Sequence, residues 1–383
     1  MTNPLDDIHI VGVLGFAHST SRNKFIGKNA RRDDHGSTAT EPVVRIVTDH
    51  GLHGIGFGRV DPHKAQGLIG RSLSEVWHPK VGIKSALGRA DHALYDLVGK
   101  ALDLPIWQLL GAHGPAAVPV YDTTLYFHDL LPEHASRGVG RLVDEIEQGL
   151  ELGFRQFKIK VGRGARWMDS QDGFRRDIEV IKALAKAAPT GTRLMADANN
   201  QFGLEETRRF LGEVGEYIFF IEEPFPESLE DGRALKKWMT DGQFNVLLAD
   251  GETEHDPEKL FDLADQGGLD VLQPDIRALG IAVQSQLAHS ISSHPRLELA
   301  PHCWGSYLGT FKMLQLARGA PGILTCEIDL MTSDLFDDSL WKIRNGSVVV
   351  PDAPGTGLKV REDVFRREHL PNAWRVGDIR SMS

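Results

Sequence analysis

The sequence predicts an α/β protein built around a parallel sheet of eight strands. From about residue 119 to residue 339, short β-rich runs that end in polar residues alternate with helical segments. Parallel strands need crossover connections, which these helical segments supply. Eight is also the number of parallel strands that closes a barrel, and a doubly wound open sheet is the alternative architecture. The eight runs are residues 118–127, 157–161, 193–198, 217–221, 246–249, 270–273, 297–300 and 323–326.

The region before residue 119 has a different texture and predicts a small α+β domain. A polar segment, 18–40, follows the first strand-like stretch. Asp49-His50-Gly51 has the chemistry of a hairpin turn between the second and third stretches. Residues 85–102 carry apolar side chains at helical spacing, which predicts a helix. The strand-like stretches are residues 8–16, 42–48 and 53–60.

Composition narrows the class of protein. The formal net charge is -10 and the isoelectric point is near 5.9, so nothing attracts the chain to nucleic acid or to anionic membranes. Two cysteines, Cys303 and Cys326, are too few for a disulfide framework and suit a reducing compartment. The first residues lack the pattern of a signal peptide, and no apolar run approaches the roughly 18 residues of a membrane span. We therefore expect a cytoplasmic protein.

Charged and polar side chains stand at the carboxyl ends of the predicted strands. Successive groups lie 23 to 37 residues apart, which corresponds to one strand–helix unit each. Catalytic residues of an α/β barrel come from these strand ends, so the side chains would converge on one mouth. Each motif alone suits an ordinary turn, cap or surface position, but their common register with the repeat indicates an active site. The groups are Lys158, Lys160, Asp197, Glu222, Glu252, Asp275, His302 and Glu327.

Three of these groups predict a metal site. Asp197, Glu222 and Glu252 follow three successive strands and would repel one another without a cation. Oxygen ligands favour a hard ion, Mg²⁺ before Mn²⁺, with positions left for water and substrate. Such an ion would hold a substrate carboxylate and stabilise the charge that develops when its α-proton leaves.

The remaining groups predict acid/base chemistry. Lys158 and Lys160 alternate with Ile159, so both side chains lie on one face of a strand. Their repulsion and a nearby metal should lower the pKa of the lysine nearest the substrate, which would make it a general base. Asp275 is placed to orient His302, giving a second acid/base group on the opposite face of the substrate.

These motifs resemble the enolase superfamily, and within it the mandelate racemase subgroup, over essentially the whole chain. The stretch 104–111 resembles the link from capping domain to barrel, and 351–357 resembles the tail that returns to the cap. The resemblance implies a modified (β/α)₇β barrel, TIM-like, at residues 119–339. It also implies an α+β capping domain from both termini, with residues 1–118 at one end and 340–383 at the other.

The resemblance also implies a role for each matched residue. Lys160 would be the base of the Lys-x-Lys motif, Asp275 and His302 the His–Asp dyad, and Glu327 the acid that hydrogen-bonds the substrate carboxylate. The metal ligands would be Asp197, Glu222 and Glu252. The last choice rests on Gly251-Glu252 occurring together with the dyad, because the muconate-lactonizing subgroup uses an Asp on this strand. Asn199 is a candidate substrate-binding residue. The double glycine expected after Asp275 is missing, which leaves the role of Arg277 open.

We expect a Mg²⁺-dependent enzyme that abstracts the proton next to a carboxylate, with dehydration of an acid sugar as the first hypothesis. Racemisation or epimerisation by the same lysine and histidine is the alternative, and a catalytically silent binding protein is a third. The partners would be a small carboxylate substrate and further copies of the chain in a homo-oligomer. In the resembling family, the segment after the first strand closes over the barrel mouth. Its basic residues suggest a polyhydroxylated acid or diacid, and Arg22 and Lys24 are the candidate contacts.

Overall fold

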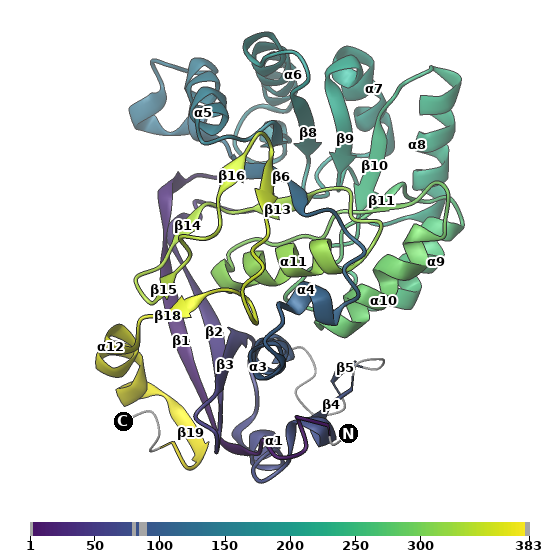
Figure 1. Ribbon diagram of the computed structural model, residues 1–383. Coiled ribbons are helices and arrows are strands. Elements are labelled where there is room, and N and C mark those ends of the chain that lie inside the picture. Colours follow the sequence, from purple (N-terminus) through teal and green to yellow (C-terminus); the bar gives the residue numbers. More distant parts are fainter. Residues whose placement is uncertain (1–2, 79–81, 84–89, 380–383) are drawn as a thin grey trace.

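The computed structural model describes residues 3–78, 82–83 and 90–379 and contains the predicted barrel (Figure 1). Strands β6 to β12 pair in chain order, each parallel to the next. The barrel closes where β13 pairs with β6 and where Leu299 of β12 bridges Ile323, just before β13. The strands are β6 Ala117–Leu125, β7 Gln156–Lys160, β8 Arg193–Asp197, β9 Ile218–Glu222, β10 Leu247–Asp250, β11 Val271–Leu272, β12 Glu298–Leu299 and β13 Cys326–Ile328.

One helix follows each of β6 to β12, so the observed order is (β/α)₇β, and Figure 1 shows helices α6 to α10 on the outside of the strands. The helices are α5 Gly140–Glu151, α6 Ser170–Ala187, α7 Leu204–Val214, α8 Leu229–Asp241, α9 Pro257–Asp265, α10 Ile281–Ser292 and α11 Tyr307–Gly319. A buried apolar core lies between strands and helices, and a smaller apolar layer that includes Tyr121, Met195 and Phe220 fills the barrel interior.

The second sheet belongs to the cap and joins both ends of the chain. Strands β1 Ile10–Ile26, β2 Gly36–Thr48 and β3 His53–Phe57 are antiparallel. β19 Trp374–Gly377, near the carboxyl terminus, pairs with the first part of β1, and β14 Met331–Thr332 pairs with its last part. Helix α3 His92–Leu102 packs on β3, where Gly54 and Gly56 leave room because an added Cβ would meet the backbone of Ala93. The predicted start of this helix, residues 85–89, lies outside the described residues.

Short elements complete the structure. β17 pairs antiparallel with β6, and β16 pairs with β17. The tail returns to the cap, where Gly355 bridges Pro105 and the Thr356 hydroxyl donates to Asp96 at 2.5 Å. The short elements are α1 Pro62–Gln66, α2 Leu73–Val76, β4 Trp77–His78, β5 Gly82–Ile83, α4 Ile106–Leu109, β15 Phe336–Asp337, β16 Ile343–Arg344, β17 Ser347–Val349, β18 Lys359–Val360 and α12 Glu362–Val364. Among the described helices, none is long and apolar enough to cross a membrane.

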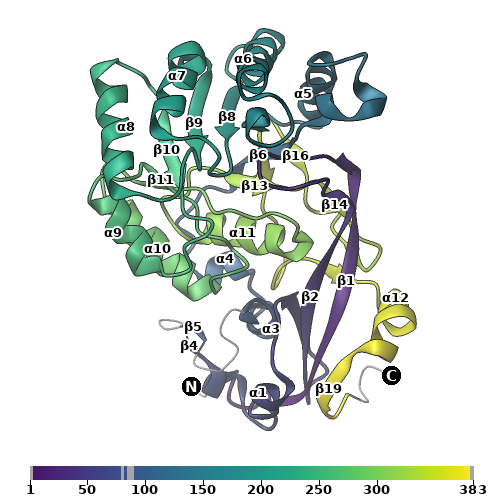
Figure 2. The same ribbon diagram turned by 180° about the vertical axis from the view of Figure 1, so that it is seen from behind.

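The polar segment 18–40, which lies outside the predicted strand-like stretches, is mostly strand in the structure. β1 continues to Ile26 and β2 begins at Gly36, so most of the segment forms two long strands that run from the cap to the barrel (Figure 2). Alternate residues of β1 are buried, but they are the polar His18, Thr20 and Arg22. Hydrophobic alternation, the usual strand signal, is therefore absent here. Only residues 27–35 remain as the connection between the two strands.

The eighth barrel strand is also displaced from its predicted position. It covers Cys326–Ile328 and not residues 323–326. Glu327 therefore lies within the strand, opposite Tyr121 of β6, and does not follow it.

Candidate active site

Five of the predicted residues line one cavity of about 120 Å³ at the carboxyl ends of the barrel strands. Lys160 and Asn199 come from the β7 and β8 ends, and Glu252 from the β10 end. His302 follows β12, and Glu327 lies in β13. The β-barrel thus brings together side chains from residues 160 to 327, as the strand-end prediction required.

A network of lysines and carboxylates forms the floor of this site. Lys158 Nζ lies 2.5 Å from Glu222 Oε1, 3.0 Å from Glu327 Oε1 and 3.6 Å from Asp197 Oδ2. Lys160 donates to Asp197, and its Nζ lies 5.2 Å from the centre of the Tyr126 ring. The register explains the arrangement: Lys160 of β7, Asp197 of β8 and Glu222 of β9 are neighbouring partners across parallel strands, so they share one face.

This network sets the pKa values of the two lysines. Burial alone would lower the pKa of Lys158, but Glu222, Glu327 and Asp197 outweigh it and raise the pKa well above its ordinary value. Burial would also lower the pKa of Lys160, and Lys158 adds to this, but Asp197, Tyr126 and Glu222 together outweigh them and raise it. The repulsion between the lysines does act in the predicted direction, but here the groups around them outweigh it, and the predicted contribution of a metal stays a prediction. The surrounding carboxylates, from strands distant in sequence, decide the sign.

The pKa values of the neighbouring carboxylates are shifted as well. Burial raises the pKa of Glu222 to about 8, with Asp197 and Glu327 adding to it and Lys158 opposing. Burial raises the pKa of Glu223 to about 7, together with Glu252 and Asp197. Burial also opposes ionisation of Asp197, but Lys160 and Lys158 lower its pKa on balance. Negative charge at this end of the barrel is therefore only partly neutralised by the two lysines.

The residues fit a hard cation by donor chemistry, although in the described structure they are paired differently. Asp197 and Glu222 contact the lysines, Gln273 Nε2 donates to Glu222 at 2.6 Å, and Glu252 contacts His302. Among the described residues, no three such side chains are grouped closely enough to hold a metal. The buried Asn199 Oδ1 and Gln273 Oε1, however, have no hydrogen-bond partner in the described structure. Carboxylate and amide oxygens beside repelling carboxylates are the donor set that Mg²⁺ favours.

His302 and Asp275 form the predicted dyad. His302 Nδ1 lies 3.1 Å from Asp275 Oδ2, and His302 Nε2 lies 3.1 Å from Glu252 Oε2. Burial lowers the pKa of His302, but Glu252, Glu327 and Asp275 outweigh it and raise the pKa to about 10. Arg277, whose role the sequence left open, donates Nε to Asp275 at 3.0 Å and lines the cavity. It holds the carboxylate that orients the imidazole.

Glu327 is fixed by two donors. The Thr123 hydroxyl donates to Oε1 at 2.6 Å, and the Cys303 backbone N–H donates to Oε2 at 2.6 Å. Burial raises the pKa of Glu327, but Lys158, His302 and these donors outweigh it, so the pKa lies below its usual range. Its side chain is thus held as an anion beneath the cavity.

The cap contributes different residues to the cavity from those predicted. Arg22 is buried and pairs with Asp329 at 3.0 Å, and Lys24 pairs with Glu145 at 2.7 Å. Neither lines the cavity. Asn29, Arg31, Arg32 and His35, from the connection between β1 and β2, line it instead. The basic residues that the cap contributes to the cavity are therefore Arg31 and Arg32, and not the predicted Arg22 and Lys24.

Tyr126 and Trp304 complete the wall and were missed in the sequence. Their rings stack at 5.0 Å between centroids, and Trp304 Nε1 donates to His35 Nδ1 at 3.3 Å. An indole nitrogen only donates, so His35 Nδ1 must accept and Nε2 must carry the proton. Burial, and then Lys160, lowers the pKa of His35 to about 4, which keeps it neutral. Trp304 could have been noticed two residues after His302, but nothing local distinguishes Tyr126.

A buried ion cluster supports the lysine strand. Arg163, fully buried, contacts Asp129 at 2.7 Å and Asp177 at 2.6 Å, and its Nη1 donates to the Lys160 carbonyl at 3.3 Å. We expect Arg163→Met to lower the free energy of unfolding by about 3–5 kcal/mol, because buried Asp177 loses its counterion and buried Asp129 loses one of two. Urea unfolding measures this change. Arg176→Met is the control, since Arg176 is partly exposed and contacts Asp129 at 3.2 Å, and an equal loss would contradict the expectation.

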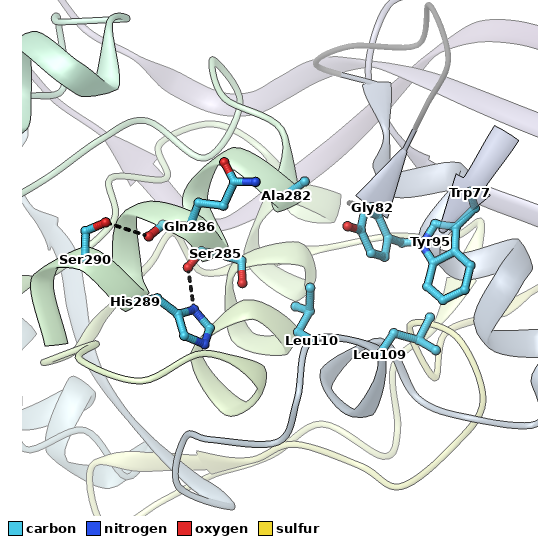
Figure 3. Close-up of a pocket in the computed structure, with 10 residues that line it drawn as sticks. All are labelled: Trp77, Gly82, Tyr95, Leu109, Leu110, Ala282, Ser285, Gln286, His289 and Ser290. Atoms are coloured by element: carbon cyan, nitrogen blue, oxygen red, sulfur yellow. Dashed lines mark hydrogen bonds between the residues drawn. The ribbon is translucent and has the colours of Figure 1, made fainter. Parts of the chain in front are cut away.

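A second cavity, of about 430 Å³, lies between the cap and the barrel, and none of the predicted site residues lines it (Figure 3). Trp77 and Tyr95 stand on its cap side, and α10 forms the opposite wall. Two of its polar side chains bond to the backbone of α10 itself: His289 Nδ1 to the Ser285 carbonyl at 2.8 Å and Ser290 Oγ to the Gln286 carbonyl at 3.2 Å. This arrangement offers no acid/base pair.

The fold and the cavity define a class: capped α/β barrels with buried lysine, histidine and carboxylate groups at the mouth. The chain belongs to the family described as Enolase C-terminal domain-like, whose model matches residues 141–364.

Individual relatives agree with this assignment. Arabinonate dehydratase of Saccharolobus solfataricus is 28% identical over 290 residues, covering 73% of this chain and 71% of the relative. D-galactarolactone cycloisomerase of Agrobacterium fabrum is 28% identical over 306 residues, covering 75% of each chain. Galacturonate dehydratase from Geobacillus sp., complexed with D-galacturonate and 5-keto-4-deoxy-D-galacturonate, matches with 30% identity and a TM-score of 0.87 over 97% of this chain and 100% of that one. A mutant of the same enzyme, complexed with Mg, matches with 29% identity and a TM-score of 0.92 over 99% of each chain.

Proposed function

We propose that this protein is a Mg²⁺-dependent acid-sugar dehydratase, which removes the proton next to a carboxylate and eliminates the β-hydroxyl to give a 2-keto-3-deoxy acid. The observation that carries the proposal is that Lys160 and His302 line the same cavity from different sides of the barrel. Between their strands, β7 and β12, stand β6 and β13 on one side and β8 to β11 on the other. A substrate between them would meet one group on each face.

Each residue has a part in this reaction. Lys160 is paired with Asp197 as an ammonium, so it would act as the base in its neutral form, after the cation takes its place beside Asp197 and the lysine gives up a proton. It then takes the α-proton, and His302, oriented through Nδ1 by Asp275, donates a proton to the departing β-hydroxyl. The α-carbon to hydrogen bond and the β-carbon to oxygen bond break, water leaves, and the enol product tautomerises to the keto acid. Glu327 and Asn199 contact the substrate, and Lys158 holds Glu327 and Glu222 in place. Asp197, Glu222 and Glu252 would hold the cation once Asp197 and Glu222 exchange their lysine partners for it. Bound there, Mg²⁺, or Mn²⁺ in its place, would stabilise the negative charge that develops on the substrate carboxylate.

A substrate screen tests the proposal. The purified protein, supplied with Mg²⁺, is incubated with aldonic, aldaric and uronic acids, and 2-keto products are detected as semicarbazones. We expect keto product from at least one acid sugar, as relatives named dehydratases suggest. Inversion of a stereocentre without loss of water would instead support the racemase or epimerase alternative. Absence of any reaction would contradict both.

The cap residues suggest which acid sugars bind. Arg31 and Arg32 are exposed on the cap side of the cavity, and within the described residues no salt bridge engages either side chain. Arg22 and Lys24, in contrast, are already paired. Guanidinium groups bind carboxylates through two parallel hydrogen bonds. The substrate we propose therefore carries a second carboxylate, or a strongly polar end, away from Lys160, and the neutral His35 donates from Nε2 to a substrate oxygen.

Substitution of these arginines measures that preference. We expect Arg31→Met and Arg32→Met each to raise KM for a diacid or uronate by about 10-fold, because each removes a hydrogen bond to a charged group of about 1.5–3 kcal/mol. KM for a monoacid with the same reacting end is the control and should change less. Equal changes of KM for both substrates, or no change, would show that the two arginines are solvated surface residues that do not contact the substrate.

A further inference from the structure

The turn that carries His302 is held by carboxylates of the next strand. This turn, residues 302–306, connects β12 to α11. The Cys303 N–H donates to Glu327 at 2.6 Å, and the Gly305 N–H donates to Asp329 Oδ2 at 3.1 Å. Asp329 lies just after β13 and is buried. Two acidic side chains therefore fix the backbone of the turn on both sides of Trp304.

Arg22 of the cap strand β1 contacts the turn directly at Trp304 and holds Asp329, which accepts from the Gly305 N–H. Its Nε and Nη2 donate to Asp329 Oδ2 at 3.1 and 3.0 Å, and its Nη1 donates to the Thr38 carbonyl at 2.8 Å. Its guanidinium also lies 4.8 Å from the centre of the Trp304 ring. The side chains of Arg22 and Asp329 are only 3% and 0% exposed, so solvent screening does not weaken the pair.

We propose that Arg22 is a positioning residue that fixes the 302–306 turn, and through it the placement of His302 and Trp304 at the cavity. The inference rests on the proposed function, in which His302 is the acid. A buried carboxylate without a counterion is strongly disfavoured, so loss of Arg22 would lead Asp329 to protonate or to turn away. The Gly305 N–H would then lose an acceptor that is ionised, and Trp304 would lose the cation above its ring.

Arg45 provides a matched control in the same sheet. It lies on β2, is buried, and donates to both oxygens of Glu362 at 3.0 and 2.6 Å. Its guanidinium lies 4.5 Å from the centre of the Phe365 ring. Arg45 thus makes the same kinds of contact as Arg22, a carboxylate pair and an aromatic ring, but it does not line the cavity or touch the 302–306 turn. Because the Glu362 side chain is 38% exposed, Arg45→Met should lose less stability than Arg22→Met, and it should not lose catalysis.

Kinetics on the best acid sugar form the first test. We expect Arg22→Met to lower kcat by about 10- to 100-fold, since a small misplacement of a catalytic group costs up to about 10²-fold, with KM within about threefold of the parent. The exchange of the substrate α-proton with D₂O, which depends on Lys160, should fall less than water loss. Arg22→Lys retains the charge without the fork and should give an intermediate kcat, and it replaces Arg22→Met if that variant does not fold. A raised KM at unchanged kcat, or a kcat loss equal to that of Arg45→Met, would overturn the proposal.

The second test does not depend on a substrate. The protein is labelled with 5-fluorotryptophan and studied by ¹⁹F NMR. The Trp304 resonance is the one that is absent from the spectrum of Trp304→Phe. We expect the Trp304 resonance to shift or broaden in Arg22→Met and to stay unchanged in Arg45→Met. An unshifted resonance in Arg22→Met and Arg22→Lys would overturn the positioning role even if no acid sugar is turned over. If the resonance shifts but the protein has no dehydratase activity, the positioning of the 302–306 turn by Arg22 is supported and the proposed function is contradicted.

Discussion

Glu222→Gln is expected to lower kcat by at least about 10³-fold while the protein stays folded. Glu222 stands between Lys158, at 2.5 Å, and Gln273, at 2.6 Å, next to Asp197, and its pKa is raised to about 8. An amide of the same shape fills this space without the charge that a divalent cation needs. A bound cation lowers the activation free energy by several kcal/mol, and roughly 1.36 kcal/mol corresponds to a tenfold change in rate. Circular dichroism and urea unfolding establish the fold, and keto-acid formation gives kcat.

Glu223→Gln is the matched control, one residue along the chain. Glu223 accepts from Asn200 at 2.9 Å and from Asn199 at 3.3 Å, so an amide in its place disturbs mainly these two contacts. We expect a clearly smaller effect on kcat. If Glu223→Gln proved to be the inactive variant and Glu222→Gln the active one, the ligand assignment would move by one residue. Treatment with a chelator should abolish turnover of the parent protein and Mg²⁺ should restore it; full activity after complete removal of metal would contradict the metal requirement.

Lys160→Ala and His302→Asn are each expected to lower kcat by about 10²–10⁴-fold, the contribution typical of general acid–base groups. The two variants should differ in what survives. Without His302, Lys160 still removes the α-proton, so substrate should exchange hydrogen with D₂O without releasing water. Without Lys160, exchange and dehydration should fall together. Proton NMR in D₂O follows the first process and the semicarbazone assay follows the second.

Arg277→Met separates the acid from the residue that orients its partner. Arg277 donates to Asp275, which accepts from His302, so its loss should shift the pH profile and lower kcat less than His302→Asn does. Dehydration by His302→Asn at the parent rate would show that another group is the acid. Exchange that persists in Lys160→Ala would show that another group is the base.

The barrel was predictable from the sequence because each of its strands has a recognisable local sequence pattern. The β-rich runs are short, a helix follows each of the first seven, and these seven overlap the observed strands closely. The long cap strands were not predictable in the same way. The buried face of β1 beyond Ala17 is polar because it meets polar partners, such as Ser333 at 2.8 Å from His18 and Asp329 beside Arg22. A pattern of hydrophobic alternation does not reveal a strand whose buried side chains are satisfied by hydrogen bonds.

The site divides in the same manner. Residues at the strand ends, such as Lys160 and His302, follow from the repeat, and the structure places them on one cavity. The contributions of the cap do not follow, because basic residues in one segment look alike in sequence. Whether a given arginine faces the cavity or a buried carboxylate depends on partners such as Asp329, more than 300 positions away. The pKa values of the two lysines likewise depend on carboxylates from other strands, which their own segment of sequence does not reveal.

The pairing of β1 with β19 has a consequence for synthesis of the chain. Gly12 lies opposite Gly377, so β1 leaves the ribosome more than 300 residues before the strand that covers this edge. β2 can cover the other edge early, because the two strands are neighbours in sequence. Until β19 has been synthesised, this part of the outer edge of β1 presents unpaired backbone groups, which favour pairing with other chains. The risk of misassembly is therefore greatest during synthesis of the chain, before the cap over the barrel mouth is complete.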